Sequence, residues 1–241
     1  MDVTVLGSSG TYGGPGNACS GYFIQADGFA LAADLGPGTL SRLGGLTDLA
    51  QLDAIVISHS HPDHWLELPI LRNALRYVLE AGPLDVFATA ETWSLLEGVC
   101  HEIAPTFVPH VITDGDDVKI GPLRVRFART DHPPETLSMR FDYDGRSLAY
   151  SADTGPGWSF SALGSGIDLG ICEGTYLDEE RAAGVHLTAA QAGAVARQAG
   201  VQSLVLTHLV PGADEVEYLR QASETYGAPV HLATPGAIFT P

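Results

Sequence analysis

Basic residues are scarce in this chain of 241 residues. Twelve lysines and arginines stand against 29 aspartates and glutamates, which gives a formal net charge of −17. Proteins that bind nucleic acids need a basic surface, because cationic side chains displace the counterions of the phosphates. A chain this acidic should repel tRNA, DNA and anionic membranes. A small anionic substrate remains compatible with it, because a bound metal would restore positive potential at the active site.

Long hydrophobic runs and paired cysteines are also missing. No stretch approaches the roughly 20 unbroken apolar residues that span a bilayer. No basic or apolar segment precedes the first strand, so we expect no secretory signal. Cys19, Cys100 and Cys172 are odd in number and scattered along the chain, which argues against a disulfide framework and favours buried, reduced thiols. These absences predict a cytoplasmic protein that does not contact a membrane.

The remaining composition suits a compact core. Hydrophobic residues make up 45% of the chain and charged residues 17%. The sequence contains no short repeat, low-complexity tract or linker, so we expect one domain over residues 1–241. Strands alternate with helices in the first and last parts of the chain, and Asp114-Gly115 and Asp144-Gly145 are hairpin turn signals between them. This order predicts an α/β fold, with two sheets packed face to face and helices outside, as an αββα four-layer sandwich.

Hydrophobic periodicity gives the expected elements. Apolar and β-branched runs predict strands, and leucines at helical spacing predict helices. The predicted strands are 3–6, 21–25, 29–34, 52–57, 84–88, 123–127, 138–142, 147–150, 168–172, 203–207 and 230–233. The predicted helices are 38–43, 65–79, 91–103, 188–199 and 215–226.

The densest motif in the chain is Ser-His-Ser-His-Pro-Asp-His at positions 58–64. Neutral imidazole and carboxylate are the usual protein ligands of a divalent metal such as zinc. The motif lies between a buried strand and a helix, which is a rigid place for a metal site. The alternative is a histidine-rich surface loop, and the density of ligand types argues against it. Four candidate ligands lie in this stretch: His59, His61, Asp63 and His64.

Three further candidate ligands lie at the ends of predicted strands: His132, Asp153 and His208. Each follows an apolar strand at the point where the chain enters a loop. Taken alone, either histidine is an ordinary loop residue. One short motif rarely completes a metal site, so together with the first cluster the three predict the remainder of the site.

These seven residues, in this order, resemble the metallo-β-lactamase superfamily over nearly the whole chain. The resemblance implies two divalent metal ions, zinc or manganese. The first ion would be held by the equivalents of His59, His61 and His132, and the second by those of Asp63, His64 and His208. The equivalent of Asp153 would bridge both ions. A histidine at position 61, where glutamate could stand, argues against the di-iron flavoprotein branch.

Two more motifs resemble the ribonuclease Z branch of that superfamily, which cleaves phosphodiesters. They are Glu173 in Ile171–Tyr176 and His186 in the segment 186–192. The resemblance implies that the histidine donates a proton and that the glutamate orients it. Phosphodiester hydrolysis needs an activated water, stabilised oxygens and a proton for the leaving alkoxide. The candidate catalytic residues are therefore Asp63, His186 and Glu173. The simpler interpretation of His186 is a helix-flanking histidine, and that of Glu173 is a surface carboxylate.

The chain departs from that branch in one segment. The tRNA enzymes carry a long arm between the equivalents of His132 and Asp153, which here are only 21 positions apart (153 − 132 = 21). Such an arm cannot fit. The chain is more similar to the compact bacterial cyclic-nucleotide phosphodiesterases of the superfamily, especially the actinobacterial ones. That resemblance implies a small anionic phosphodiester as substrate, a 3′,5′-cyclic nucleotide converted to the 5′-monophosphate, and a homodimer.

Three other functions remain open on the sequence. A ribonuclease Z-like RNA 3′-processing endonuclease is disfavoured by the charge and the missing arm. A lactonase or thioesterase shares the seven ligands but does not explain Glu173 and His186. A non-catalytic metal-binding or scaffold protein would not need so complete a ligand set. The glycine-rich loop Gly7–Gly16 has no P-loop pattern, so its glycines either let backbone approach a ligand or permit tight turns.

Overall fold

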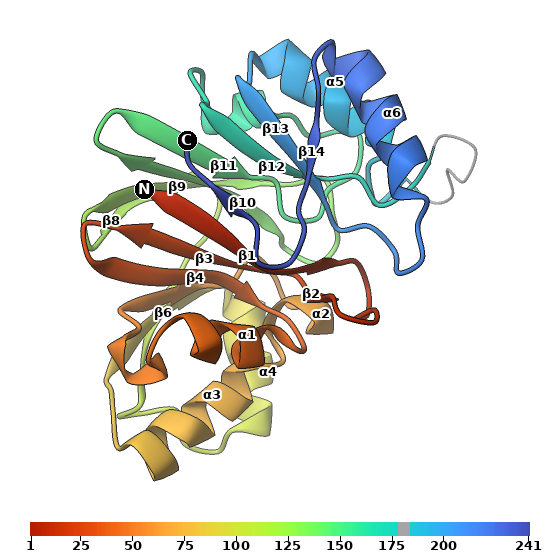
Figure 1. Ribbon diagram of the computed structural model, residues 1–241. Coiled ribbons are helices and arrows are strands. Elements are labelled where there is room, and N and C mark those ends of the chain that lie inside the picture. Colours follow the sequence, from red (N-terminus) through yellow and green to blue (C-terminus); the bar gives the residue numbers. More distant parts are fainter. Residues whose placement is uncertain (178–183) are drawn as a thin grey trace.

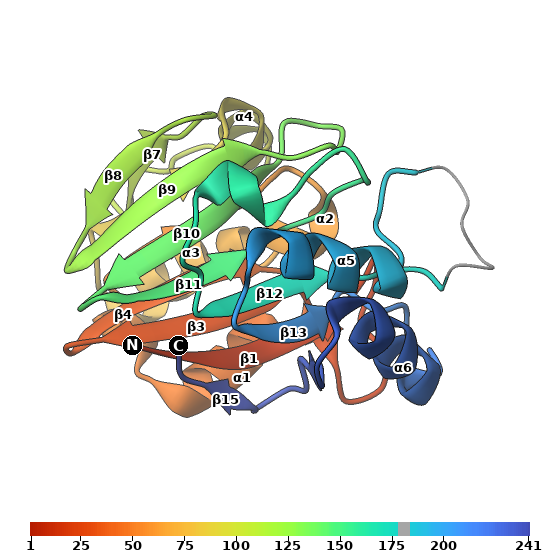
Figure 2. The ribbon, with the colours of Figure 1, turned by 90° about the horizontal axis from the view of Figure 1, so that it is seen from above.

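Two β-sheets pack face to face between two layers of helices, as Figure 1 shows. The computed structural model describes residues 1–177 and 184–241. Both views place the N- and C-termini side by side (Figures 1 and 2), where β1 pairs with β15. The predicted αββα four-layer sandwich is confirmed. Within the described residues, no helix is long and apolar enough to cross a bilayer.

The first sheet carries eight strands in the order β15-β1-β3-β4-β5-β6-β7, with β2 paired to β1. Its strands are β1 (Asp2–Ser9), β2 (Ala18–Cys19), β3 (Gly21–Ala26), β4 (Phe29–Leu35), β5 (Ala54–Val56), β6 (Leu84–Ala88), β7 (Phe107–Val111) and β15 (Ile238–Phe239). Its outer face is covered by α1 (Thr39–Leu46), η1 (Leu49–Gln51), α2 (Pro62–Trp65), α3 (Leu68–Ala74), the π-helical turn η2 (Leu75–Leu79) and α4 (Ala90–Val99).

The second sheet carries seven strands in the order β14-β13-β12-β11-β10-β9-β8. They are β8 (Asp117–Ile120), β9 (Leu123–Arg129), β10 (Leu137–Tyr143), β11 (Arg146–Tyr150), β12 (Leu169–Glu173), β13 (Ser203–Thr207) and β14 (His231–Leu232). Its outer face packs against η3 (Phe160–Leu163), α5 (Ala189–Ala199) and α6 (Glu215–Tyr226).

Alternation along the strands divides the core into three layers. In β4, Leu31 and Ala33 face the other sheet, whereas Ala30 and Ala32 face the helices. Successive side chains of a strand point to opposite faces, and a strand buried on both faces is apolar at nearly every position. The sequence of these central strands therefore reads as continuous apolar runs, which explains why their positions were predictable.

Parallel pairing brings the candidate site residues together. Strands β4, β5 and β6 run parallel to one another in the first sheet, and β11, β12 and β13 do so in the second. The carboxyl ends of parallel strands meet at one edge of their sheet, where ligands of α/β proteins commonly bind. The loops after these strands therefore gather at one end of the sandwich.

The predicted single helix 65–79 is wrong, because this segment is broken. One helix ends at Trp65, a second begins at Leu68, and a π-helical turn follows it. Pro62 and Pro69 each lie in the first turn of a helix, the position that tolerates a residue without a backbone N–H. Each proline therefore begins its own helix.

Helix α4 is also shorter than the predicted 91–103. It ends at Val99, and Cys100 is already extended. Pro105 further excludes helical backbone at the residue before it. Ile103 nevertheless packs against the first sheet's helical layer, which is why its apolar spacing imitated a longer helix.

One of the two hairpin signals is confirmed. Asp144 and Gly145 have positive φ angles of 49° and 72° and join β10 to the antiparallel β11. The other prediction is wrong, because Asp114-Gly115 joins β7 of the first sheet to β8 of the second. Neither of these two strands was predicted. Pro109 lies within β7, and a proline within an apolar run lowers its strand signal and is tolerated on an edge strand such as this one.

Candidate metal centre

The structure brings all seven predicted ligands together at the carboxyl ends of the strands. One group contains His59, His61, His132 and Asp153, and a second contains Asp63, His64 and His208. Within each group the potential ligand atoms lie within 4.8 Å of one another. The first four candidates follow β5 directly, and the others follow β9, β11 and β13.

Asp153 lies between the two groups. Its Oδ1 is 3.3 Å from His64 Nε2 and 3.4 Å from His208 Nε2. Its Oδ2 is 3.7 Å from His59 Nε2 and 3.9 Å from His132 Nε2. One oxygen thus faces each group, which is the arrangement of a carboxylate shared between two cations.

Three buried atoms at the centre have no hydrogen-bond partner among the described residues: His59 Nε2, His64 Nε2 and Asp153 Oδ1. A buried polar atom without a partner costs about 1–3 kcal/mol, so native proteins rarely leave one unsatisfied. Here three such atoms from two sheets converge on the same space. Divalent cations held by the two groups would satisfy all of them, and the imidazole and carboxylate donors fit such ions.

Protonation at the centre follows from burial and charge. Burial alone would raise the pKa of Asp153, but the facing His208, His64 and His59 outweigh it and hold that pKa well below its usual range. Burial, with the charge of His64, lowers the pKa of His59 well below its usual value. An ionised carboxylate and a neutral imidazole are the forms that bind a metal.

His64 differs from His59. Burial lowers its pKa, but the charges of Asp153 and Asp34 outweigh burial and raise that pKa well above the usual value. A cation entering the centre would therefore displace a proton from His64, as metal binding to histidine sites generally does.

The buried carboxylate of Asp34 orients two of the candidate ligands. It accepts from His64 Nδ1 at 2.7 Å and from Ser58 Oγ at 2.9 Å. Ser58 Oγ in turn lies 2.9 Å from His59 Nδ1. Because both Nδ1 atoms are hydrogen-bonded, both Nε2 atoms remain free to face the centre. A hydrogen bond on the ring nitrogen that does not bind the metal is the usual support of a metal-binding histidine.

Sequence reasoning missed Asp34, although a signal existed. Asp34 is fully buried and lies one residue before the end of the apolar strand β4. A carboxylate in such a position is tolerated only when it is paired or hydrogen-bonded. Its φ of 58° is left-handed, and so is that of His208, at 62°. Backbone in this sparsely populated region concentrates at functional sites.

Glu173 is the second buried carboxylate of the site. It accepts from His186 Nδ1 at 2.9 Å, from Thr154 N at 2.6 Å and from Thr175 Oγ1 at 2.8 Å. Thr175 Oγ1 also lies 2.8 Å from His208 Nδ1. Because Glu173 is fully buried, it is not the surface carboxylate of the simpler interpretation.

His186 lies beside both groups of candidate ligands. Its ring centroid is 5.0 Å from that of His132 and 5.3 Å from that of His208. Burial lowers the pKa of His186, but the hydrogen bond and charge of Glu173, with Asp153 and Asp63, outweigh burial and raise that pKa above its usual value. The arrangement can present a protonated imidazole to a ligand in the centre.

The glycine-rich loop reaches the centre. The backbone N–H of Thr11 donates to Asp63 Oδ2 at 2.8 Å. A Cβ at Gly10 would lie 2.6 Å from the carbonyl oxygen of His208, and one at Gly36 would overlap with that of Asp63. Gly16, with φ of 76° and open space around it, serves a turn. The turn interpretation is therefore supported at Gly16, whereas Gly10 lets the loop backbone pass close to that of His208.

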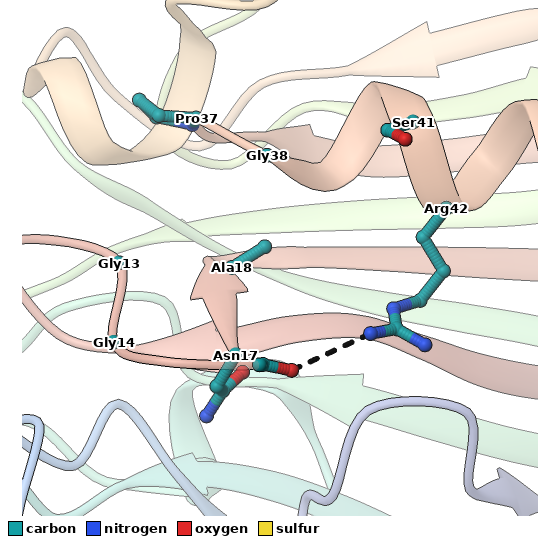
Figure 3. A pocket seen from close by; sticks show the side chains of 9 residues that line it. Gly13, Gly14, Asn17, Ala18, Pro37, Gly38, Ser41 and Arg42 are labelled. Atoms are coloured by element: carbon teal, nitrogen blue, oxygen red, sulfur yellow. Dashed lines mark hydrogen bonds between the residues drawn. The ribbon is translucent and has the colours of Figure 1, made fainter.

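A groove of about 480 Å³ lies beside this loop, between it and the first turn of α1. Figure 3 shows Arg42 reaching from α1 toward the loop, where its guanidinium lies 3.5 Å from the carbonyl oxygen of Gly16. Of the described residues that line the groove, Arg42 is the one with a charged side chain, and none of them is one of the seven candidate ligands.

Comparisons with known proteins agree with this geometry. The profile of the family described as "Beta-lactamase superfamily domain" matches residues 31–209. An uncharacterised protein of Mycobacterium tuberculosis is 34% identical over 249 residues, which cover 98% of this chain and 91% of that protein. Ribonuclease Z of Mycobacterium marinum is 27% identical over 266 residues, which cover 96% of this chain and 95% of that enzyme.

The probable metallo-hydrolase YhfI of Bacillus subtilis is similar in both sequence and structure. It is 28% identical over 247 residues, which cover 99% of each chain. Its crystal structure matches this chain with a TM-score of 0.90 at 25% sequence identity, covering 99% of this chain and 98% of that one. The similarity thus extends over the whole sandwich and its loops.

Two layers of sheet, two layers of helix and a histidine-carboxylate centre at the strand ends define a metal-dependent hydrolase. The chain belongs to the beta-lactamase superfamily. The prediction of this superfamily and of an enzyme is confirmed, and a non-catalytic scaffold is not supported.

Proposed function

We propose that the chain is a dinuclear metal-dependent phosphodiesterase, with a 3′,5′-cyclic nucleotide as the leading substrate and the 5′-monophosphate as product. The observation that supports this most is the His186–Glu173 pair beside both groups of candidate ligands. The leaving group of such a substrate is an alkoxide, which needs a proton as it departs. A buried glutamate holding a histidine at this position supplies one.

Each residue of the centre has a role in this proposal. Two divalent cations, zinc or manganese, would supply Lewis-acid stabilisation of the phosphoryl oxygens and a lowered pKa for the attacking water when bound. His59, His61 and His132 would hold one ion and Asp63, His64 and His208 the other, and Asp153 would serve both.

His186 is the proposed proton donor. Glu173 occupies its Nδ1, so Nε2 is the atom that gives a proton to the departing 3′-oxygen. Asp63 is 8% exposed and Asp153 only 2%. Asp63 is therefore the better placed carboxylate to take a proton from the attacking water.

An RNA 3′-processing endonuclease is the nearest alternative, supported by the similarity to ribonuclease Z. Against it stand the net charge of −17 and the single short hairpin, β10–β11, between His132 and Asp153. A lactonase or thioesterase has the same ligand chemistry, but its reaction does not explain the buried His186–Glu173 pair. A panel of cyclic mononucleotides, a dinucleotide, precursor tRNA and lactones, with zinc- and manganese-loaded protein, separates these functions.

The substitution His186→Ala tests the proton donor. General acid catalysis contributes about 10²–10⁴-fold, so kcat on cyclic AMP should fall within that range while the metal content stays that of the wild type. The loss should shrink on bis-p-nitrophenyl phosphate, whose leaving group needs little protonation. Asp153→Ala is the matched control, because metal content and activity should then fall together.

Three results would contradict the assignment. Equal losses on cyclic AMP and on the p-nitrophenyl ester would show that His186 is not the acid. Loss of metal in His186→Ala would place this residue among the ligands. Wild-type turnover of lactones without turnover of any phosphodiester would overturn the proposed substrate class.

We also propose a cytoplasmic homodimer in which residues 1–241 form one domain. The three cysteines are free and buried, which suits a reducing compartment. Ile70 and Tyr77, on α3 and the π-helical turn, are 56% and 65% exposed, and Val99 on α4 is 58% exposed. Tyr77 and Val99 line the same surface groove. Exposed apolar side chains that lie together favour an interface between protein copies, and sedimentation equilibrium measures whether two copies associate.

A further inference from the structure

Two buried tyrosine hydroxyls connect the sheets next to the candidate metal centre. Tyr150 of β11, in the second sheet, donates to Asp34 Oδ2 of β4, in the first, at 2.9 Å. Tyr22 of β3, in the first sheet, lies 2.6 Å from Thr207 Oγ1 of β13, in the second. Their ring centroids are 4.8 Å apart. Each sheet thus contributes one tyrosine hydroxyl that contacts the other sheet near its candidate ligands.

Both contacts end beside candidate ligands. Asp34 holds His64 directly and His59 through Ser58. Tyr150 is three positions before Asp153, which faces both groups. The Tyr150–Asp34 bond therefore joins the carboxylate that orients ligands of the first sheet to the strand that carries the shared ligand of the second.

Packing alone does not hold the two halves in register. The facing surfaces of the sheets are apolar, with Val5, Leu31, Phe141 and Leu148 among the buried side chains, and apolar attraction is non-directional. A hydrogen bond restricts both distance and angle. Metal–ligand distances vary by only about 0.2 Å, so the spacing between the sheets must be fixed closely at this end.

We propose that Tyr150 is a positioning residue, whose hydroxyl, through Asp34, holds His64 in register with Asp153 and so sets the affinity of the centre for its second ion. The inference rests on the proposed function, in which these residues are ligands. The other hydrogen bonds described for the Asp34 carboxylate come from Ser58 and His64, which lie in the segment that follows β5 of the first sheet. Loss of the Tyr150 hydroxyl removes the connection to the second sheet and leaves those three bonds in place.

The hydroxyl is a dependable donor. Burial, with the charge of Asp34, raises the pKa of Tyr150 well above its usual value, so the phenol stays protonated and points its hydrogen at the carboxylate. The phenyl ring contributes to the core in Phe as in Tyr. Tyr150→Phe is therefore a substitution that removes this one bond and keeps the packing.

The experiment compares metal binding in the wild type, Tyr150→Phe and Tyr226→Phe by competition with a chromophoric chelator. Mutation of outer-sphere partners of metal ligands lowers metal affinity by about 10–100-fold. We expect Tyr150→Phe to bind the second ion, that of Asp63, His64 and His208, about tenfold less tightly and the first ion as the wild type does. Its kcat should fall at limiting metal and return to the wild-type value in excess metal.

Tyr226→Phe is the matched control. Its hydroxyl donates to the carbonyl oxygen of Val201 at 2.8 Å, on the helical side of the second sheet. This variant should lower the melting temperature without changing metal affinity. Equal metal affinity in the wild type and Tyr150→Phe, or equal weakening in both variants, would overturn the inference. Fewer than two ions in the wild type would instead contradict the dinuclear centre, and the comparison of variants would still decide the role of Tyr150.

Discussion

At the scale of single residues, two buried carboxylates share the orientation of the centre's histidines. Asp34 binds His64 directly and reaches His59 through the hydroxyl of Ser58. Glu173 repeats this arrangement, binding His186 directly and reaching His208 through Thr175. Each carboxylate therefore fixes which imidazole nitrogen faces the centre, which histidine alone does not determine.

The first prediction concerns Asp34→Asn. The asparagine side chain keeps one acceptor oxygen. Its NH₂ group, however, replaces the oxygen that accepted the other hydrogen bonds, so that two donors face each other. We expect a loss in metal affinity of about 10–100-fold, measured by metal analysis after dialysis against graded chelator.

Asp168→Asn is the matched control for that variant. The Asp168 carboxylate also accepts from a backbone N–H and a serine hydroxyl, both of Ser147, but the bonds lie away from the candidate ligands. Similar metal retention in Asp34→Asn and Asp168→Asn would show that Asp34 does not support the ligands.

At the scale of elements, strand ends and glycines position the site. The ligand-bearing loops follow parallel strands, so their distances to one another are set by the sheets and not by the loops themselves. Glycine at positions 10 and 36 lets backbone pass close to His208 and Asp63. The outer helices depend on small residues in the same way, because Gly193 of α5 lies against α6.

The second prediction compares two glycines in helices. A Cβ at Gly193 would overlap with the backbone of Ala222 and the side chain of Thr225. Gly193→Ala should therefore lower the free energy of unfolding by about 1–3 kcal/mol, as overpacking does. Gly45 of α1 has open space around it, and Gly45→Ala should raise that free energy by about 0.5–1 kcal/mol. Denaturant unfolding measures both, and equal effects would contradict the α5–α6 contact.

At the scale of the whole molecule, charge and the two-sheet architecture decide what the enzyme can bind. The net charge of −17 is distributed over a chain with 12 basic residues, whereas the candidate centre concentrates histidines from both sheets. A polyanion meets repulsion over its whole length. In the proposed function, a small phosphodiester that entered the centre would meet the charge of the bound ions first.

The third prediction follows from this charge. Precursor tRNA should bind weakly or not at all even at low salt, because little counterion release is available to drive association. Filter binding over a range of salt concentrations, with a basic tRNA-binding protein as positive control, measures it. A complex with a Kd below about 1 µM at moderate salt would overturn the argument from charge.

The fourth prediction concerns metal removal. The candidate ligands come from both sheets, so cations that bind the folded state alone stabilise it by mass action. Chelation should lower the melting temperature, and added zinc should restore it, as read by calorimetry. An unchanged melting temperature after metal removal, verified by metal analysis, would show that the ions do not connect the two sheets.

Much of the fold and of the candidate centre could be predicted from the sequence, for chemical reasons. Few residue types bind divalent metals, so His59 to His64 stood out, and the end of an apolar strand marked His132, Asp153 and His208. Strands buried on both faces are nearly continuous apolar runs, which made β4, β12 and β13 predictable. Strand β7 contains a proline and lies at an edge, where that local signal is weak.

Only the tertiary structure decided which residues support the ligands. His64 is 30 positions from Asp34, and Tyr150 is 116 positions from it. No local pattern encodes such pairs, because the Asp34–His64 bond exists only once β4 and β5 have paired, and the Tyr150–Asp34 bond exists only after the two sheets have packed. The sequence by itself determined which side chains can bind a metal. The packing of the sheets decided which carboxylates and hydroxyls hold those side chains in place, since directional bonds between distant strands depend on the register of the whole sandwich.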